Sequence, residues 1–377
     1  MAKTIYFVAG EASADNHGAA LMRALRDSNA DLRFIGRGGP QMKAVASDDF
    51  DNWIDKSGVL GLWEVIKQYG YFREQFRATL REIAAKKPDI VVLIDYPGFN
   101  LRLARALRKR SSRPFIIYYI SPQVWAWNRG RIRKMARWID LMLCIFPFEA
   151  DLYNRSGLRT VFVGHPMVER LAAKKIDVTR NTNLVGLFPG SRAREVRKIF
   201  PVMIETAREL RKSKPDMHFE VAAASNELAR QMEAILDSQD RQLFAIKVGE
   251  TSEIMQRAFV GIVASGSATL EAAYFEMPFA LVYKVAWPTY LAGRALVKVK
   301  YLGMPNVLAD KQVVSEFIQH NARAGEIAKA IARLIDDAQA RQTMLWEFGK
   351  IIAQLGPAGA SRRAAEEIFS YQPDDSE

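Results

Sequence analysis

One carboxylate directly follows a strongly apolar run of the chain. The segment DIVVLID at 89–95 has strand length and β-branched residues, and it ends in Asp95. A carboxylate just beyond a buried strand points into a ligand cleft, where partial loss of water raises its pKa toward that of a useful general base. The alternative is that Asp95 caps the helix expected after Tyr96-Pro97-Gly98. The local sequence does not decide between these two roles.

The loop GEASAD at 10–15 follows the first apolar run, TIYFVAG, and precedes a helix expected to start near His17. Ser13 or Asp15 could cap that helix, and the free backbone N–H groups at its start suit a phosphate or a sugar hydroxyl. Capping does not explain Glu11. We therefore expect the Glu11 carboxylate to contact hydroxyl groups of a ligand.

Two small-residue turns stand after apolar runs in the second half of the chain. LFPGSR places Gly190, Ser191 and Arg192 between an expected strand and a helix. The spacing is neither that of a P-loop nor that of a GxGxxG fingerprint, so neither ATP nor a dinucleotide is indicated. Backbone N–H groups at a helix start, together with one guanidinium, are nevertheless suited to a diphosphate.

The second turn belongs to the segment VASGSATLEAA. Ser265, Gly266 and Ser267 are small enough for a ligand to approach the backbone closely. Glu271, in the first turn of the helix expected next, can accept hydrogen bonds from both hydroxyls of a ribose. Its alternative role is to complement the helix dipole, although that role does not explain the run of small residues before it.

Aromatic and basic residues are combined in the segment 58–77, GVLGLWEVIKQYGYFREQFR. Aromatic rings flanked by cations on an amphipathic stretch are typical of a membrane-surface or acyl-chain site, and core packing is the alternative. The residues assigned to this site are Leu62, Trp63, Val65, Ile66, Tyr69 and Phe72.

Lys and Arg number 54 against 42 Asp and Glu, a net charge of +12, which suggests an anionic partner. Nucleic acid, an acidic membrane and phosphorylated small molecules all meet that description. The stretch WAWNRGRIRK at 125–134 could bind single-stranded nucleic acid by stacking and phosphate contact, or equally an anionic lipid headgroup. The alternative is a solvated basic helix behind two packing Trp residues. No recognised binding motif accompanies it, so charge is the only support for a nucleic-acid partner.

The elements that must position these residues alternate along the chain. Short apolar runs are separated by stretches with helical apolar spacing, which predicts α/β architecture with parallel sheets. The pattern restarts after a polar stretch near 165–183, and 377 residues suffice for two domains. We expect two facing, doubly wound, Rossmann-like domains at 1–170 and 171–355, followed by a helix and tail at 356–377 that cross back to the first domain.

Two features point to the cytoplasm. The chain holds a single cysteine, Cys144, inside an apolar run, so an internal disulfide is excluded and a reducing compartment is favoured. No run of about 18 uncharged apolar residues occurs, so no spanning helix is expected.

A set of motifs covering nearly the whole chain resembles the lipid-A-disaccharide synthase family. In order, these motifs are AGEASAD-x-HGA, IGRGGPQM, PDIVVLIDYPGFNLRLA, YYISPQVWAW, FPFE, FVGHP, FPGSR-x-x-E, ASGSATLEAA, MP-x-x-LVYK, LGMPN and GASRRAA. The resemblance implies a GT-B glycosyltransferase of lipid A and lipopolysaccharide biosynthesis. Such an enzyme joins UDP-2,3-diacylglucosamine to 2,3-diacylglucosamine 1-phosphate (lipid X) with inversion, releasing UDP, and uses neither metal nor cofactor.

The resemblance further implies peripheral attachment to the inner face of the cytoplasmic membrane and a homodimer with exchanged C-terminal portions. It also implies site roles. Arg192 and Glu271 would take the diphosphate and the ribose, and Asn306 of LGMPN would lie near the nucleotide. Asp95 would be the general base. His17 is the competing base, because its expected position at a helix N-terminus beside the first loop also faces the cleft. Glu11, Ser13 and Asp15 would line the acceptor side.

The chain departs from the family pattern at three positions: Ala14 stands where Gly is usual, Asn128 where Arg is usual, and Ser267 where Thr is usual. Ser267 keeps the hydroxyl, and Arg129 and Arg131 are close enough to replace the missing guanidinium. The rival enzyme classes are another GT-B UDP-sugar transferase and a UDP-sugar epimerase. Neither needs the aromatic, basic segment 58–77.

Overall fold

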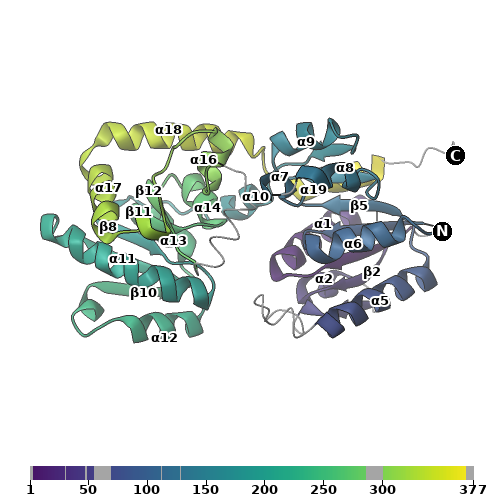
Figure 1. Cartoon of the computed structure of the whole chain (residues 1–377), viewed down its shortest axis with the longest axis horizontal. Coiled ribbons are helices and arrows are strands. Elements are labelled where there is room, and N and C mark those ends of the chain that lie inside the picture. The colour runs from purple at the N-terminus through teal and green to yellow at the C-terminus, as the bar shows by residue number, and fades with distance from the viewer. Residues whose placement is uncertain are drawn as a thin grey trace. The chain divides into compact units, whose positions relative to one another are not determined.

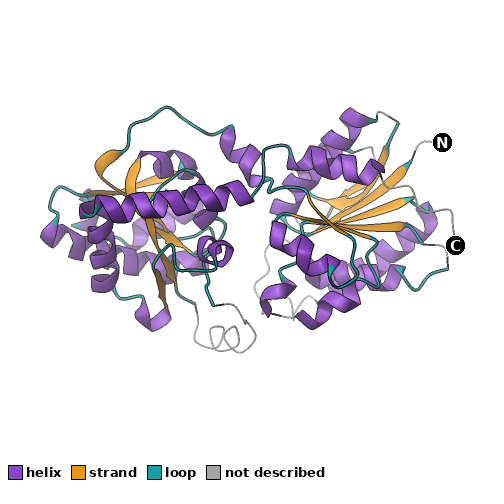
Figure 2. Ribbon diagram, turned by 90° about the horizontal axis from the view of Figure 1, so that it is seen from above, coloured by secondary structure: helices purple, strands orange, loops and turns teal. Residues whose placement is uncertain are grey.

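A computed structural model of the chain describes residues 3–29, 31–46, 49–54, 69–111, 113–127, 129–285 and 300–370. The chain divides into two units. Unit 1 comprises Met1–Pro166 together with Leu355–Glu377, and unit 2 comprises Met167–Gln354. In each unit, helices cover both faces of a parallel sheet (Figures 1 and 2). The α/β class expected from the alternating pattern is confirmed.

The sheet of unit 1 has seven parallel strands in the order β3-β2-β1-β4-β5-β6-β7. Their bounds are β1 Thr4–Ala9, β2 Arg33–Gly38, β3 Phe50–Asn52, β4 Ile90–Ile94, β5 Phe115–Tyr119, β6 Leu141–Cys144 and β7 Thr160–Phe162. The strand order reverses between β1 and β4, whose register pairs Ala9 with Ile94. Ligands of open α/β sheets bind at such a reversal, outside the carboxyl ends of the strands. The residues that follow Ala9 and Ile94 therefore occupy the expected ligand edge.

Alternate residues of the unit 1 strands face opposite sides of the sheet. On β1, Ile5 and Phe7 pack into one core, whereas Tyr6 and Val8 pack into the other. The helices of unit 1 are α1 Ala12–Ser28, α2 Pro40–Val45, α5 Tyr69–Lys86, α6 Pro97–Leu107, α7 Val124–Trp127, η1 Arg129–Arg131, α8 Ile132–Met135, α9 Pro147–Asn154 and α19 Ala360–Ser370. Ala364, Ala365 and Ile368 of α19 complete the core beside α1. The C-terminal helix thus belongs to unit 1.

The sheet of unit 2 has six parallel strands in the order β10-β9-β8-β11-β12-β13. Their bounds are β8 Asn181–Phe188, β9 His218–Ala223, β10 Phe244–Val248, β11 Ala258–Ala264, β12 Phe279–Tyr283 and β13 Glu316–Ile318. Here the reversal lies between β8 and β11. The helices are α10 Met167–Ala172, α11 Ala193–Ser213, α12 Asn226–Ile235, η2 Asp240–Gln242, α13 Thr251–Arg257, α14 Ala268–Tyr274, α16 Met304–Ala309, η3 Gln319–Asn321, α17 Ala324–Asp336 and α18 Ala338–Gln354.

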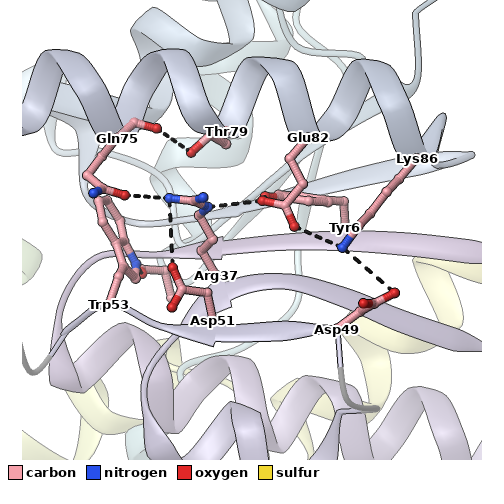
Figure 3. Close-up of polar contacts among 10 residues, drawn as sticks. Tyr6, Arg37, Asp49, Asp51, Trp53, Gln75, Thr79, Glu82 and Lys86 are labelled. Atoms are coloured by element: carbon pink, nitrogen blue, oxygen red, sulfur yellow. Dashed lines mark hydrogen bonds and ion pairs between the residues drawn. The ribbon is translucent and has the colours of Figure 1, made fainter.

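A polar network joins α5 to the sheet of unit 1 (Figure 3). Arg37 Nε of β2 lies 3.1 Å from Glu82 Oε2 of α5, and Tyr6 Oη of β1 donates to the same oxygen at 2.7 Å. Lys86 Nζ reaches Glu82 Oε1 at 2.9 Å. Burial opposes the ionisation of Glu82, but the bonds from Lys86, Tyr6 and Arg37 outweigh it, so the pKa of this carboxyl is lowered. The Arg of the IGRGGPQM motif therefore fixes the position of α5.

Candidate functional site

A pocket of about 440 Å³ opens at the carboxyl ends of β8, β9 and β11 in unit 2. It brings together nearly all the residues predicted to bind a UDP group, although they come from two turns far apart in the sequence. These residues are Gly190, Ser191, Arg192, Ser265, Gly266, Ser267 and Glu271. We call this the donor pocket. Only Asn306 of the predicted set is not among its lining residues.

The Gly190 turn is shaped by Glu195, the last residue of the FPGSR-x-x-E motif. Gly190 has φ +111°, and an added Cβ would lie 2.4 Å from Glu195 Oε2. That oxygen accepts from Ser191 N at 3.2 Å, while Oε1 lies 3.2 Å from Arg192 Nη1. The Arg192 side chain is 79% exposed. It is therefore available to a ligand at the start of α11, whose first N–H groups receive no side-chain cap.

The second turn presents backbone rather than side chains. Gly266 has φ +151°, and an added Cβ there would meet no atom within 4 Å. Thr269 Oγ1 donates to Gly266 O at 2.8 Å and steadies the turn. A positive φ explains the glycine, and the open space beside it leaves room for a ligand to approach the chain.

Glu271 lies in the first turn of α14, as predicted, and is held from outside that helix. Its Oε1 accepts from Arg170 Nη2 at 2.8 Å, and the Glu271 side chain is 13% exposed. Arg170 and Lys174 also line the donor pocket. Neither cation was predicted from the sequence, because both fall in the polar stretch near 165–183 where the domain boundary was expected. No sequence motif marks them.

Asn306 has a different place from the one expected. It is fully buried, and its Nδ2 donates to Val314 O and Glu316 Oε1, while its Oδ1 accepts from Val313 N and Val314 N. Its side chain is thus occupied with the chain between α16 and β13. We assign Asn306 to positioning this segment instead of touching the nucleotide.

Asp95 lies at the carboxyl end of β4 in unit 1, at the strand reversal. Asp95 and Tyr96 both adopt left-handed backbone, with φ of 46° and 47°. Such strain needs support from the surroundings. Asn100 Nδ2 donates to Asp95 O at 2.8 Å and to Ile94 O at 3.1 Å, and Tyr118 Oη donates to Asp95 O. Asn100, whose role the sequence did not predict, thus fixes the backbone that carries the carboxylate.

The Asp95 carboxyl is more basic than an ordinary aspartate. Burial raises its pKa, and the nearby negative charge of Glu11 raises it further, to about 6. The alternative role as a helix cap is wrong: Tyr96 occupies the cap position of α6, and no side-chain cap bond forms there. A carboxylate with this pKa is mostly ionised at neutral pH and is a stronger base than an ordinary aspartate.

The loop at 10–15 is shorter than predicted, because the helix that follows it starts earlier. Helix α1 begins at Ala12, not near His17, and Glu11 stands at its cap position without a side-chain cap bond. Glu11 and Ser13 are exposed, and His17 is half-buried on the same helix. Gly10 lies under the Tyr96 ring, since an added Cβ would be 2.3 Å from Tyr96 Cδ1. Close packing against this ring thus explains the glycine.

Asp15 caps α2 instead of α1. It is 2% exposed, and its two oxygens accept from Gly39 N, Gln41 N and Met42 N, each at 2.9 Å. An added Cβ at Gly39 would lie 2.5 Å from Asp15 Oδ2, which accounts for that glycine. Because both oxygens are occupied by backbone, we assign Asp15 to holding α2 and not to contact with an acceptor.

A second buried carboxyl, Glu149 of the FPFE motif, organises the SPQVW segment. Ser121 Oγ donates to its Oε2 at 2.6 Å, and Trp125 Nε1 donates to its Oε1 at 2.9 Å. Burial raises the pKa of Glu149 to about 7. Trp125 is 6% exposed, so its ring is not available for stacking on a nucleic-acid base. Asn128 lies outside the described residues.

The predicted acyl segment is described only from Tyr69, where α5 begins. Leu62, Trp63, Val65 and Ile66 lie outside the described residues. Phe72 is half-buried and lines a hollow of about 510 Å³ together with Phe76, Phe99 and other residues of α5 and α6. Within the described ranges, no helix is long and apolar enough to span a bilayer, and no cluster of three or more His, Cys, Asp or Glu side chains suits a metal ion.

Two doubly wound parallel units, with a pocket at the carboxyl ends of the strands, define the GT-B class of fold. Solved structures agree. UDP-GlcNAc 2-epimerase from Neisseria meningitidis superposes with a TM-score of 0.63 at 12% identity, covering 98% of this chain and 99% of that one. The calicheamicin glycosyltransferase CalG4 gives a TM-score of 0.57 at 14% identity, covering 100% and 99%. At this identity the likeness shows the fold and does not separate a transferase from an epimerase.

Sequence comparison makes that separation. Residues 5–366 match the family described as lipid-A-disaccharide synthetase. The lipid-A-disaccharide synthase of Geobacter sulfurreducens is 36% identical over 371 residues, covering 96% of this chain and 95% of the relative. Lipid-A-disaccharide synthase 1 of Legionella pneumophila (strain Philadelphia 1) is 35% identical over 381 residues, covering 99% and 98%. The chain belongs to the lipid-A-disaccharide synthetase family, as the motif set predicted.

Proposed function

We propose that this protein condenses UDP-2,3-diacylglucosamine with lipid X to give a β-1,6-linked disaccharide 1-phosphate and UDP. The observation that carries the proposal is the kinship with lipid-A-disaccharide synthases over nearly the whole chain. The donor pocket supports it, because its residues suit a nucleoside diphosphate without P-loop spacing. The product is a precursor of lipid A and hence of lipopolysaccharide.

Binding of the donor follows from the two turns of unit 2. The uncapped start of α11, which follows the Gly190 turn, offers N–H groups to the diphosphate, and Arg192 adds an exposed guanidinium. Glu271 has one oxygen on Arg170 and the other for the ribose hydroxyls. As UDP departs, negative charge grows on the diphosphate, so the same groups stabilise the transition state more than the bound donor.

Asp95 supplies the base for the acceptor. It takes the proton of the acceptor 6-hydroxyl while that oxygen attacks the anomeric carbon from the face opposite UDP. The new C–O bond forms as the bond to the diphosphate breaks, and UDP leaves with that electron pair. One displacement of this kind inverts the anomeric centre. The raised pKa of Asp95 and its rigid place at a strand end suit proton abstraction.

The acceptor is a lipid, so we further propose peripheral contact with the inner face of the cytoplasmic membrane. The segment 58–77 and the net charge of +12 are the features that favour it. We also propose a homodimer that exchanges C-terminal portions, as the family resemblance implies; the packing of α19 on α1 is the contact that such an exchange would form between chains. Light scattering coupled to size exclusion tests the dimer.

The decisive assay incubates the protein with UDP-2,3-diacylglucosamine and lipid X and follows products by mass spectrometry. We expect a disaccharide 1-phosphate and UDP in equal amounts. Release of no UDP, with isomerisation of the donor sugar, would instead identify an epimerase. UDP should raise the melting temperature and an oligonucleotide should not; the reverse would support a nucleic-acid partner.

A further inference from the structure

A hollow of unit 1 adjoins the residue that follows the proposed base. It measures about 510 Å³ and is lined by Phe72, Arg73 and Phe76 of α5 and by Tyr96, Gly98, Phe99 and Arg102 at the start of α6. We call it the aromatic-arginine pocket. Its size falls in the range of small-molecule sites, roughly 300–1,000 Å³. One of its lining residues, Tyr96, directly follows Asp95 in the chain.

The walls of the aromatic-arginine pocket are apolar rings that pack on each other. Phe99 and Phe76 lie edge to face with centroids 5.7 Å apart, and Tyr96 stacks on Phe99 at 6.1 Å. Phe99 itself is 6% exposed and packs on the buried Trp53, so the floor belongs to the core. These rings offer an apolar surface on which an alkyl chain can pack away from water.

The two cations of the aromatic-arginine pocket have no carboxylate partner in the described part of the chain. Arg73 and Arg102 are both exposed, and the described lining includes no Asp or Glu. Arg37 behaves differently, since its guanidinium is ion-paired with Glu82 beneath α5. Two unpaired guanidiniums beside apolar rings complement a ligand with an alkyl chain and an anionic group.

The two helices that line the pocket, α5 and α6, are both fixed to the rest of unit 1. The Arg37–Glu82–Tyr6 network fixes α5 on the sheet (Figure 3), and Asn100 fixes the start of α6. An added Cβ at Gly98 would meet no atom within 4 Å, so the absence of a side chain there leaves the pocket open. The hollow is therefore built into the fold rather than formed by loose side chains.

We infer that the aromatic-arginine pocket binds the acceptor of the transfer reaction, with an acyl chain between the rings and the phosphate monoester on Arg73 and Arg102. This inference rests on the proposed function and adds the subsite for its lipid substrate. The acceptor fits better than the donor because it carries a free phosphate monoester, whereas the phosphates of the donor are joined to uridine. The pocket also belongs to the same strand-to-helix turn as Asp95, the proposed base, since Tyr96 lines it and stands at the cap position of α6.

The charge test uses Arg73→Gln and Arg102→Gln, with Arg105→Gln as the matched control. Arg105 is exposed on α6, the helix that carries Arg102, and does not line the pocket. We expect each pocket variant to lower kcat/KM for the acceptor about tenfold or more, as for loss of a charged hydrogen bond. KM for the UDP-sugar and the melting temperature should stay at the parent values. The control should match the parent.

A dephosphorylated acceptor identifies the group that the arginines bind. The parent should discriminate against it, and the two Arg variants should lose most of that discrimination. If the variants weaken both acceptors equally, the arginines do not read the phosphate and the inference fails. If they weaken only binding to anionic vesicles, the pocket serves the bilayer lipid and the inference likewise fails.

The volume test fills the pocket with Gly98→Leu and compares it with Gly325→Leu. Gly98 and Gly325 each stand second in a helix, α6 and α17, and an added Cβ meets no atom within 4 Å at either position. We expect Gly98→Leu to raise KM for the long-chain acceptor and to spare a short-chain one. Loss of UDP-sugar binding instead would assign the pocket to the donor. An inactive parent would refute the proposed function, whereas an active parent with unaffected variants would refute only this subsite.

Discussion

Replacing Asp95 by Asn should make the protein more stable and nearly inactive at the same time. Burial and the charge of Glu11 raise the pKa of Asp95 from 3.8 to about 6. Since each pKa unit corresponds to about 1.4 kcal/mol, the folded state disfavours the ionised form by about 3 kcal/mol. Asn keeps the shape of the side chain and removes its charge. The same substitution removes the proposed base.

The effect on stability depends on pH with a definite sign. Between about pH 4 and pH 6, folded Asp95 holds its proton more tightly than the unfolded chain does, so stability falls as pH rises through this window. Above pH 6 the full cost of the buried charge is present. We therefore expect Asp95→Asn to raise the free energy of unfolding of unit 1 by up to about 3 kcal/mol at pH 7.5 and to change it little at pH 4.

Hydrogen exchange of the peptides that contain β4 and β5 measures this stability without assuming that the two units unfold together. The kcat of Asp95→Asn, measured in parallel with its UDP affinity, should fall by a factor of about 10²–10⁴. Asp151→Asn, at an exposed carboxylate of α9, is the control and should change neither property. Near-normal turnover of Asp95→Asn with a loss in His17→Ala would move the base role to His17. Unchanged or reduced protection at pH 7.5 would refute the electrostatic reasoning.

Three further outcomes are expected. Glu11→Gln should shift the acid limb of the pH–rate profile to lower pH by up to about one unit, because burial is the larger cause of the raised pKa of Asp95; an unmoved limb would exclude Glu11 from this effect. Arg192→Ala should cost about 2–4 kcal/mol in kcat/KM with Arg194→Ala as the neighbouring control, and equal kinetics in both would remove Arg192 from the donor pocket. A variant with Ser in place of Trp63, Tyr69 and Phe72 should bind anionic vesicles less than the parent in a flotation assay and should remain folded. Loss of folding would show instead that these side chains belong to the core.

The sequence alone determined the residues that stand at the strand ends. Apolar runs of strand length mark where each strand stops, and in parallel sheets all these ends meet at one edge. That is why the sequence predicted that Asp95 and the two small-residue turns of the donor pocket follow strands. The class of fold followed from the same alternation, and the family followed from the order of motifs.

Tertiary structure decided what each of the polar side chains does. Asp15 bonds to backbone N–H groups at Gly39 and beyond, and Asn306 bonds to the backbone at Val313 and Val314, so neither is left for a ligand. Arg37 reaches Glu82, and the pocket that carries Arg73 and Arg102 joins two helices separated in sequence by a strand. Local sequence cannot separate a carboxylate that faces a ligand from one that caps a distant helix, because both need the same residue type beside the same kind of turn. The difference lies in which backbone groups the fold brings within hydrogen-bonding distance.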